Sequence, residues 1–246
     1  MMSDFTPQAR LYCAIDTPDV ARAVTLAQEI GGLGLGLKLG LEFFSAAGPN
    51  GVRQVLDAVG NGAMFLDLKY HDIPNTVAAA VHAASRLGPK IINVHATGGQ
   101  AMMAAAAEAA RKGASEAGHP PPWIIAVTVL TSLETDDIKR AGVTGSVTEQ
   151  VVRLATLAQE SGLDGVVCSA HEIAPIRQAL GPNFLLVTPG IRPAGADVGD
   201  QKRVMTPRDA IKAGADILVI GRPITAAPNP AAAARAILAD IQNADG

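Results

Sequence analysis

The chain has 246 residues, of which 48% are hydrophobic, and a formal net charge of -3. This length and apolar content suit one sizeable core, within the range of a single α/β barrel domain. The acidic balance disfavours a nucleic-acid partner, because neutralising a run of phosphates needs a basic face. We expect no membrane partner and no secretion signal, since no window approaches 18 uninterrupted apolar residues and residues 1–10 lack a long apolar run.

The two cysteines, Cys13 and Cys168, both lie in apolar runs that read as buried strands. They form no C-x-x-C pair and indicate no disulfide framework. We therefore expect free thiols and a cytoplasmic location, because a reducing compartment is where such thiols persist.

Short apolar runs alternate with helical patterns along the whole chain. Several runs are apolar at nearly every position, which is typical of parallel strands covered on both sides. The predicted strands are residues 11–15, 35–39, 63–68, 91–95, 124–130, 165–168, 184–187 and 217–220. Their ends recur about every 29 residues, a spacing that suits one strand–helix unit.

Eight such units predict a single (β/α)₈ barrel, the TIM-barrel architecture, over residues 1–246, with residues 1–10 as a short lead-in. An open, doubly wound parallel sheet is the competing fold. The barrel is favoured because eight regular units leave no obvious edge strand.

Start signals mark several of the intervening helices. Thr17 followed by Pro18 predicts an N-cap and the first residue of a helix. Ser146 and Glu149 have the spacing of a capping box. The alanine-rich residues 101–110 predict an exposed helix, since alanine is the best helix former.

The most informative segment surrounds the end of the third predicted strand, where a barrel carries its chemistry. Asp67 and Lys69 are two positions apart, so they point to the same face, which is the interior of a closed barrel. Burying such charges costs several kcal/mol per ion unless they are paired. A structural ion pair that closes the barrel top is one explanation. The other adds Lys38 and Asp72, giving an alternating array that holds Lys69 protonated as a proton donor.

The end of the eighth predicted strand suggests a phosphate site, as in many barrels. Gly221 lets the backbone approach an oxyanion, and Arg222 offers a planar fork for it, although a solvated surface arginine is the alternative. The long polar stretch 192–206 is either a lid or a surface loop. Asp16, after the first strand, either accepts hydrogen bonds from a sugar or favours a helix dipole.

Asp67-x-Lys69-x-x-Asp72, followed by Ile73-Pro74-Asn75-Thr76, resembles the signature of the orotidine 5'-monophosphate decarboxylase family. The resemblance covers nearly the whole chain. It implies a barrel that removes carbon dioxide from C6 of the pyrimidine and yields uridine 5'-monophosphate, the last step of de novo pyrimidine nucleotide synthesis. It implies no metal and no cofactor. The resemblance extends to Asp16, Lys38, Leu130-Thr131-Ser132, Pro189-Gly190-Ile191-Arg192 and Gly221-Arg222-Pro223-Ile224.

The resemblance also implies roles for individual residues. Lys69, Asp67, Asp72 and Lys38 would be catalytic, and Lys38 and Asp67 would also contact the nucleotide monophosphate. In the family, Asp72 and Thr76 enter the active site of the partner subunit, which implies a homodimer; Thr76 also suits the cap of a helix over residues 77–87. The remaining substrate-binding positions would be Asp16 and Thr76 for the ribose, Thr131 and Ser132 for the pyrimidine, Gln201 on the lid, Arg192, and Gly221 with Arg222 for the phosphate.

Two other functions compete with this one. Related barrels of the same superfamily, decarboxylases or aldolases, act on sugar phosphates with a divalent metal and share the Asp-x-Lys-x-x-Asp segment. They resemble one another in placing an acidic metal ligand where Lys38 stands here, so Lys38 argues against them. A non-catalytic nucleotide-binding barrel is the second alternative, and the costly charged array argues against it because a binder gains nothing from that array.

Overall fold

The computed structural model describes residues 5–60, 62–193 and 205–244. Eight parallel strands close into one barrel, in sequence order, and β8 pairs with β1. The predicted (β/α)₈ barrel is thus confirmed, and the open doubly wound sheet is wrong because the described sheet has no edge. The strands are β1 (Leu11–Ile15), β2 (Gly36–Gly40), β3 (Met64–Tyr70), β4 (Ile91–His95), β5 (Trp123–Val127), β6 (Gly165–Val167), β7 (Leu185–Pro189) and β8 (Ile217–Ile220).

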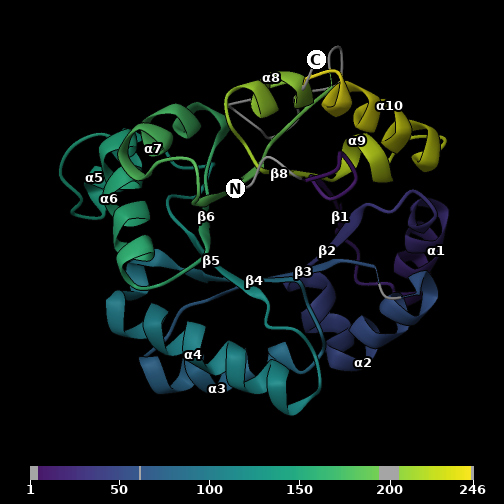
Figure 1. Cartoon of the computed structure of the whole chain (residues 1–246), viewed down its shortest axis with the longest axis horizontal. Helices are drawn as coiled ribbons and strands as arrows, with labels where there is room; N and C mark the ends of the chain where they lie inside the picture. Colours follow the sequence, from purple (N-terminus) through teal and green to yellow (C-terminus); the bar gives the residue numbers. More distant parts are fainter. Residues whose placement is uncertain (1–4, 61, 194–204, 245–246) are drawn as a thin grey trace.

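Helices surround the strands as an outer ring (Figure 1). Short 3₁₀ turns, Ala96–Gly98 and Ala170–Glu172, follow β4 and β6. Among the described residues, no helix combines the length and the apolar character needed to cross a membrane. The helices are α1 (Val20–Gly31), α2 (Leu41–Val59), α3 (Pro74–Ser85), α4 (Gln100–Glu116), α5 (Thr135–Arg140), α6 (Val147–Glu160), α7 (Ile173–Leu180), α8 (Pro207–Lys212), α9 (Arg222–Thr225) and α10 (Pro230–Gln242).

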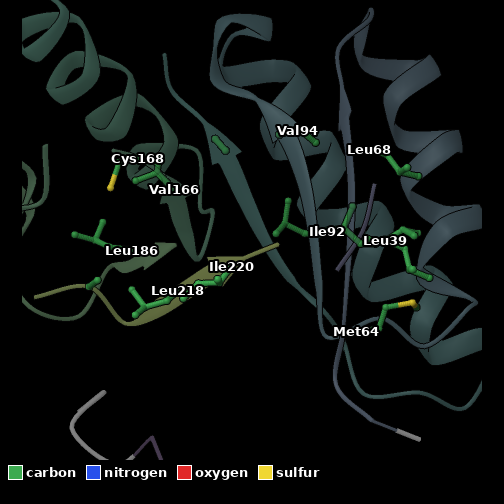
Figure 2. Close-up of a cluster of buried hydrophobic side chains, with 14 of the residues drawn as sticks. Leu39, Met64, Leu68, Ile92, Val94, Val166, Cys168, Leu186, Leu218 and Ile220 are labelled. Atoms are coloured by element: carbon green, nitrogen blue, oxygen red, sulfur yellow. The ribbon is translucent and has the colours of Figure 1, made fainter. Parts of the chain in front are cut away.

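The strands bury two separate apolar layers, because alternate side chains point to opposite faces of a strand. The outward layer packs against the helices, and Figure 2 shows part of it, including Leu39, Leu68 and Ile220. The inward layer fills the barrel, with Tyr12 and Phe65 in edge-to-face contact at 6.4 Å between ring centroids. The interior of the lower barrel is therefore a packed core. A cavity opens at the carboxyl ends of the described strands.

Several predicted element ends are wrong, and side-chain hydrogen bonds explain two of them. Asp19, not Thr17, is the N-cap of α1, since its Oδ1 accepts hydrogen bonds from two helical N–H groups while Thr17 Oγ1 accepts from Asp19 N–H. β5 ends at Val127, three residues early, because its neighbour β6 ends at Val167. The hydroxyl of Thr128 donates to the Val167 carbonyl there.

The helices next to the site also differ from expectation. α3 begins at Pro74, whose fixed φ suits a first helical position, so Thr76 lies inside the first turn instead of capping a later helix. α4 is helical as predicted, but it is exposed on one face only, since Ala101 and Ala104 are exposed while Ala106 and Ala110 are fully buried. The small residues let α4 pack closely on α3, and a Cβ at Gly113 would overlap the backbone of His82. The capping box of Ser146 and Glu149 is confirmed.

Candidate active site

A cavity of about 470 Å³ opens at the carboxyl ends of the strands, a volume suited to a small ligand. Its lower wall is apolar, with Phe65, Val127 and Val187 from three strands. Its upper wall is polar and charged. The charged and polar residues on that wall are Asp16, Lys38, Asp67, Lys69, Thr131, Arg192 and Arg222.

Four of these groups form a chain of alternating charge. Lys69 Nζ lies 2.5 Å from Asp67 Oδ1, and Lys38 Nζ lies 3.0 Å from Asp67 Oδ2. Lys38 Nζ also lies 3.4 Å from Asp16 Oδ1. Each carboxylate oxygen of Asp67 therefore has its own ammonium, and Lys38 lies between two acids. The sequence predicts that Lys38, Asp67 and Lys69 lie together, with Asp72 as the second acid. Within one chain, the second acid of the array is Asp16.

Burial and charge oppose one another at Asp67, and charge prevails. Burial by itself raises the pKa of Asp67, but Lys38 and Lys69, with hydrogen bonds from Lys69 and Asn93, lower that pKa from 3.8 to about 2. Burial by itself lowers the pKa of Lys38, but Asp67 and Asp16 raise it above its ordinary value. Asp67 and Lys38 are therefore ionised at neutral pH, and the array is a preorganised set of fixed charges.

The backbone at Lys69 has an uncommon conformation. Its φ is 48°, in the left-handed region that side chains with a Cβ rarely adopt. The β3–β4 pairing shifts register between Leu66 and Tyr70, so β3 bulges at this point. Bulges next to active sites re-aim side chains, and here the bulge directs Lys69 to the array and the cavity.

Asn93 supports this bulge, and sequence reasoning missed it. Its Nδ2 donates to Asp67 Oδ1 at 2.7 Å, and its Oδ1 accepts from the Lys69 backbone N–H at 2.8 Å. The side chain is fully buried inside the barrel. One signal could have revealed it: Asn93 is an amide in the middle of the otherwise apolar run Ile91–Val94.

The predicted binding residues divide into those that reach the cavity and those that do not. Thr131, Arg192, Gly221 and Arg222 line it, and Gly221 is the N-cap of α9, which begins at Arg222. Ser132 is exposed and is not part of the described cavity wall. Gln201 and most of the predicted lid lie outside the described residues. The two ends of that stretch are joined, because Ile191 bridges Met205 and Arg192 N–H donates to Met205 at 3.0 Å.

Asp72 and Thr76 take no part in the array within the described part of a single chain. Both are exposed, and neither lines the described cavity. Asp72 Oδ1 accepts a hydrogen bond from Ile73 N–H at 2.6 Å, and among the described residues its carboxylate makes no ion pair with Lys38 or Lys69. Within the described residues of one chain, the predicted array of Lys38, Asp67, Lys69 and Asp72 therefore forms without Asp72.

His95 lies beside the charged array but faces a different cavity. Its ring centroid is 5.5 Å from that of His71, and both line a second cavity of about 350 Å³. Burial, then the charges of His71 and Lys69, lower the pKa of His95. The described residues contain no group of three or more histidine, cysteine, aspartate or glutamate side chains placed to hold a metal ion.

The closed barrel and the charged mouth together define a class, that of (β/α)₈-barrel enzymes with a lysine–aspartate array at the carboxyl ends of the strands. The family model described as orotidine 5'-phosphate decarboxylase / HUMPS family matches residues 9–237. The chain belongs to this family.

Individual relatives agree with the family match. The chain is 55% identical over 234 residues to an orotidine 5'-phosphate decarboxylase of Moorella thermoacetica, covering 95% of this chain and 92% of that protein. It is also 55% identical over 234 residues to one of Rhodospirillum rubrum, covering 95% and 94%. The crystal structure of the Lactobacillus acidophilus orotidine 5'-phosphate decarboxylase superposes with a TM-score of 0.84 at 36% identity, covering 95% of this chain and 99% of that chain.

Proposed function

We propose that this chain decarboxylates orotidine 5'-monophosphate to uridine 5'-monophosphate, completing pyrimidine nucleotide synthesis, without a metal or cofactor. The observation that carries the proposal is Lys38. Its ammonium forms ion pairs with both Asp16 and Asp67. Asp67 in turn pairs with Lys69, which the array holds in place as a proton donor. The family match and the relatives support the same reaction.

The reaction needs stabilisation of charge at C6 of the pyrimidine. When the bond from C6 to the carboxylate breaks, carbon dioxide leaves and the electron pair stays on C6, where no adjacent carbonyl can receive it. The Lys69 ammonium offsets this charge and then transfers one proton to C6, which gives the product. The neutral amine of Lys69 regains its proton from solvent.

Asp67 would lie near the departing carboxylate. At about 4 Å and an effective dielectric constant near 20, two unit charges repel by about 4 kcal/mol, which is roughly a thousandfold in rate if fully relieved. The flanking Lys38 and Lys69 reduce this effect, so repulsion alone does not account for the catalysis. The main role of Asp67 is to hold both ammonium groups.

Binding energy far from C6 contributes as well. Gly221 and Arg222 would hold the phosphate at the end of β8, with Gln201 from the lid, while Asp16 and Thr76 would hold the ribose. Thr131, Ser132 and Arg192 would complete the substrate site. Interactions with a remote phosphate can favour closure and be expressed in the transition state.

A metal-dependent reaction on a sugar phosphate, the other activity of this superfamily, fits the array poorly. A divalent cation bound between Asp16 and Asp67 would meet the Lys38 ammonium, which already lies 3.4 Å and 3.0 Å from their oxygens. The cation and the ammonium would repel each other at this distance. The chain itself already neutralises the two acids with Lys38, which leaves them poorly suited to a metal ion.

A homodimer is the second part of the proposal. Asp72 and Thr76 are exposed at the start of α3, and the exposed Ile73 lies between them. We infer that these residues reach the cavity of a second copy, where Asp72 would extend the array beyond Lys69. Their absence from the described cavity wall of one chain supports this arrangement.

Two further inferences concern the whole chain. We infer that residues 1–246 form one domain, with residues 1–10 leading into β1, since the described barrel runs from β1 to β8 and α10 packs against α1. We infer a cytoplasmic location, because Cys13 and Cys168 are free, buried thiols suited to a reducing compartment.

The proposed function is tested by following the absorbance of orotidine 5'-monophosphate with the purified chain, before and after exhaustive chelation by EDTA. We expect turnover that chelation does not change. Loss of turnover that magnesium restores would favour the metal-dependent branch of the family. Tight calorimetric binding of uridine 5'-monophosphate without turnover of the substrate would instead identify a binding protein.

A further inference from the structure

We propose that Asn93 is a positioning residue that fixes the Asp67 carboxylate and the Lys69 backbone in one geometry. This inference rests on the proposed function and adds a residue to it. Asn93 is fully buried in β4, and its neighbours Ile92 and Val94 belong to the outward layer against the helices (Figure 2). Its side chain therefore lies on the inward face of the barrel, in contact with the array.

Asn93 replaces a missing part of the β-sheet ladder. In the β3–β4 register, Leu66 is opposite Ile92 and Tyr70 is opposite Val94. Asp67, Leu68 and Lys69 thus lie opposite Asn93 alone, so the backbone N–H of Lys69 has no regular strand partner there. The side-chain oxygen of Asn93 accepts that N–H at 2.8 Å and holds the left-handed turn of the bulge.

The other end of the same amide acts on the array. Asn93 Nδ2 donates to Asp67 Oδ1, the oxygen that also accepts from Lys69 Nζ. Asn93 therefore reaches the ammonium of Lys69 by two routes, through the backbone of Lys69 and through the carboxylate of Asp67. An amide meets both demands because it carries a donor and an acceptor, and its neutrality leaves the charge of the array unchanged.

Because of its position, Asn93 should affect the catalytic rate more than substrate binding. Asp67 and Lys69 line the described cavity, but Asn93 does not. Loss of its amide would displace Lys69 Nζ from C6 while leaving the phosphate end, at Gly221 and Arg222, intact. A displacement of about 1 Å in a reacting group can lower a rate about a hundredfold.

The first test is Asn93→Ala, assayed with orotidine 5'-monophosphate beside the wild type. We expect kcat to fall at least tenfold, while KM and the calorimetric Kd for uridine 5'-monophosphate change less than threefold. Ser161→Ala is the control, because it removes a buried side-chain hydrogen bond outside the site, from Ser161 Oγ to the Leu157 carbonyl at 2.6 Å, at the end of α6. Its kcat should stay within twofold of the wild type even where its Tm falls.

The second test uses the pH profile of Asn93→Asp. The new carboxyl keeps the acceptor for the Lys69 N–H, but when ionised it has no donor for Asp67 and repels it. Protonation restores an O–H donor, so the ratio of its kcat to that of the wild type should rise as the pH falls. Asn93→Leu, with similar volume and no polar atom, should give a low ratio that does not change with pH.

The outcomes distinguish failure of the inference about Asn93 from failure of the proposed function. If Asn93→Ala and Asn93→Asp keep kcat within twofold of a turning-over wild type, or if nucleotide affinity falls as much as kcat, Asn93 is structural and the inference is wrong. A flat pH ratio for Asn93→Asp overturns it as well, even if the alanine variant does not fold. A wild type without turnover overturns the proposed function itself, and the positioning role with it.

Discussion

Lys69 combines a strained backbone with a short ion pair. Its φ is 48° and its Nζ lies 2.5 Å from Asp67 Oδ1, so the bulge and the array together fix its ammonium at the cavity. Backbone strain of this kind is retained where the surrounding structure determines it, and it clusters at functional sites.

Removing this ammonium should abolish chemistry and spare binding. For Lys69→Ala we expect kcat to fall more than a thousandfold, because charge at C6 loses both its counter-charge and its proton source, while the Kd of uridine 5'-monophosphate changes severalfold at most. Single-turnover kinetics and calorimetry measure the two effects. A variant that keeps more than a tenth of the rate, a loss under about 1.4 kcal/mol, contradicts the role of Lys69.

Asp67 should make stability depend on acid pH. Its folded-state pKa of about 2 lies below the ordinary 3.8, so its contribution is present above pH 4 and is lost as the pH falls towards 2. The shift corresponds to about 2 kcal/mol. Urea unfolding of the wild type and of Asp67→Asn should therefore differ most near pH 6 and progressively less between pH 4 and pH 2.

Asp57→Asn, which changes an exposed carboxyl of α2, is the control for this titration. Its free energy of unfolding should stay close to that of the wild type over the same range. A constant difference between the wild type and Asp67→Asn from pH 6 to pH 2 would show that the Asp67 pKa is not depressed by folding.

Among the secondary-structure elements, α3 and α4 approach each other closely at a glycine. A Cβ at Gly113 would overlap the His82 carbonyl, so Gly113→Ala must push the helices apart. We expect a net loss of about 2 kcal/mol, because overpacking outweighs the roughly 1 kcal/mol gain in helix propensity. Gly32→Ala, which meets nothing within 4 Å at the end of α1, should be neutral or slightly stabilising in the same thermal unfolding experiment. Equal Tm values for the two variants would mean that the helices separate without cost.

The strands were predictable from sequence because their period and apolar character depend on local residues. Three of them, β1, β4 and β8, have the predicted bounds, and the start of α6 follows its capping box. The end of β5 was not predictable, since it depends on where β6 ends on the far side of α6. Asp19 and Thr17 are both good caps, and local sequence does not decide between them.

The site was predictable only where it follows from strand geometry. The two-residue spacing of Asp67 and Lys69 places them together, and Lys38 joins them from β2. Asn93 was missed because its partners are 24 and 26 positions away, and its value depends on a register shift that no local pattern encodes. The roles of Thr76, Ser132 and Gln201 stay predictions.

For the whole molecule, the proposed exchange of Asp72 between subunits predicts complementation. Lys69→Ala and Asp72→Ala should each be nearly inactive, but a heterodimer of the two contains one cavity with both native residues. Mixing after mild dissociation should therefore restore up to about a quarter of the wild-type rate, since half of the random dimers are mixed and each has one good site. If Asp72 acts within its own chain, mixing restores nothing, and a monomer by sedimentation would also contradict the dimer.

The seam between β1 and β8 has a consequence for synthesis on the ribosome. Tyr12 is opposite Val219 in that seam, so the sheet cannot close until almost the whole chain has emerged. A nascent chain that stops before β8 exposes two unpaired strand edges and lacks Gly221 and Arg222. Arrested chains of this length should therefore depend on chaperones, and the proposed phosphate-binding residues should be the last part of the cavity to form.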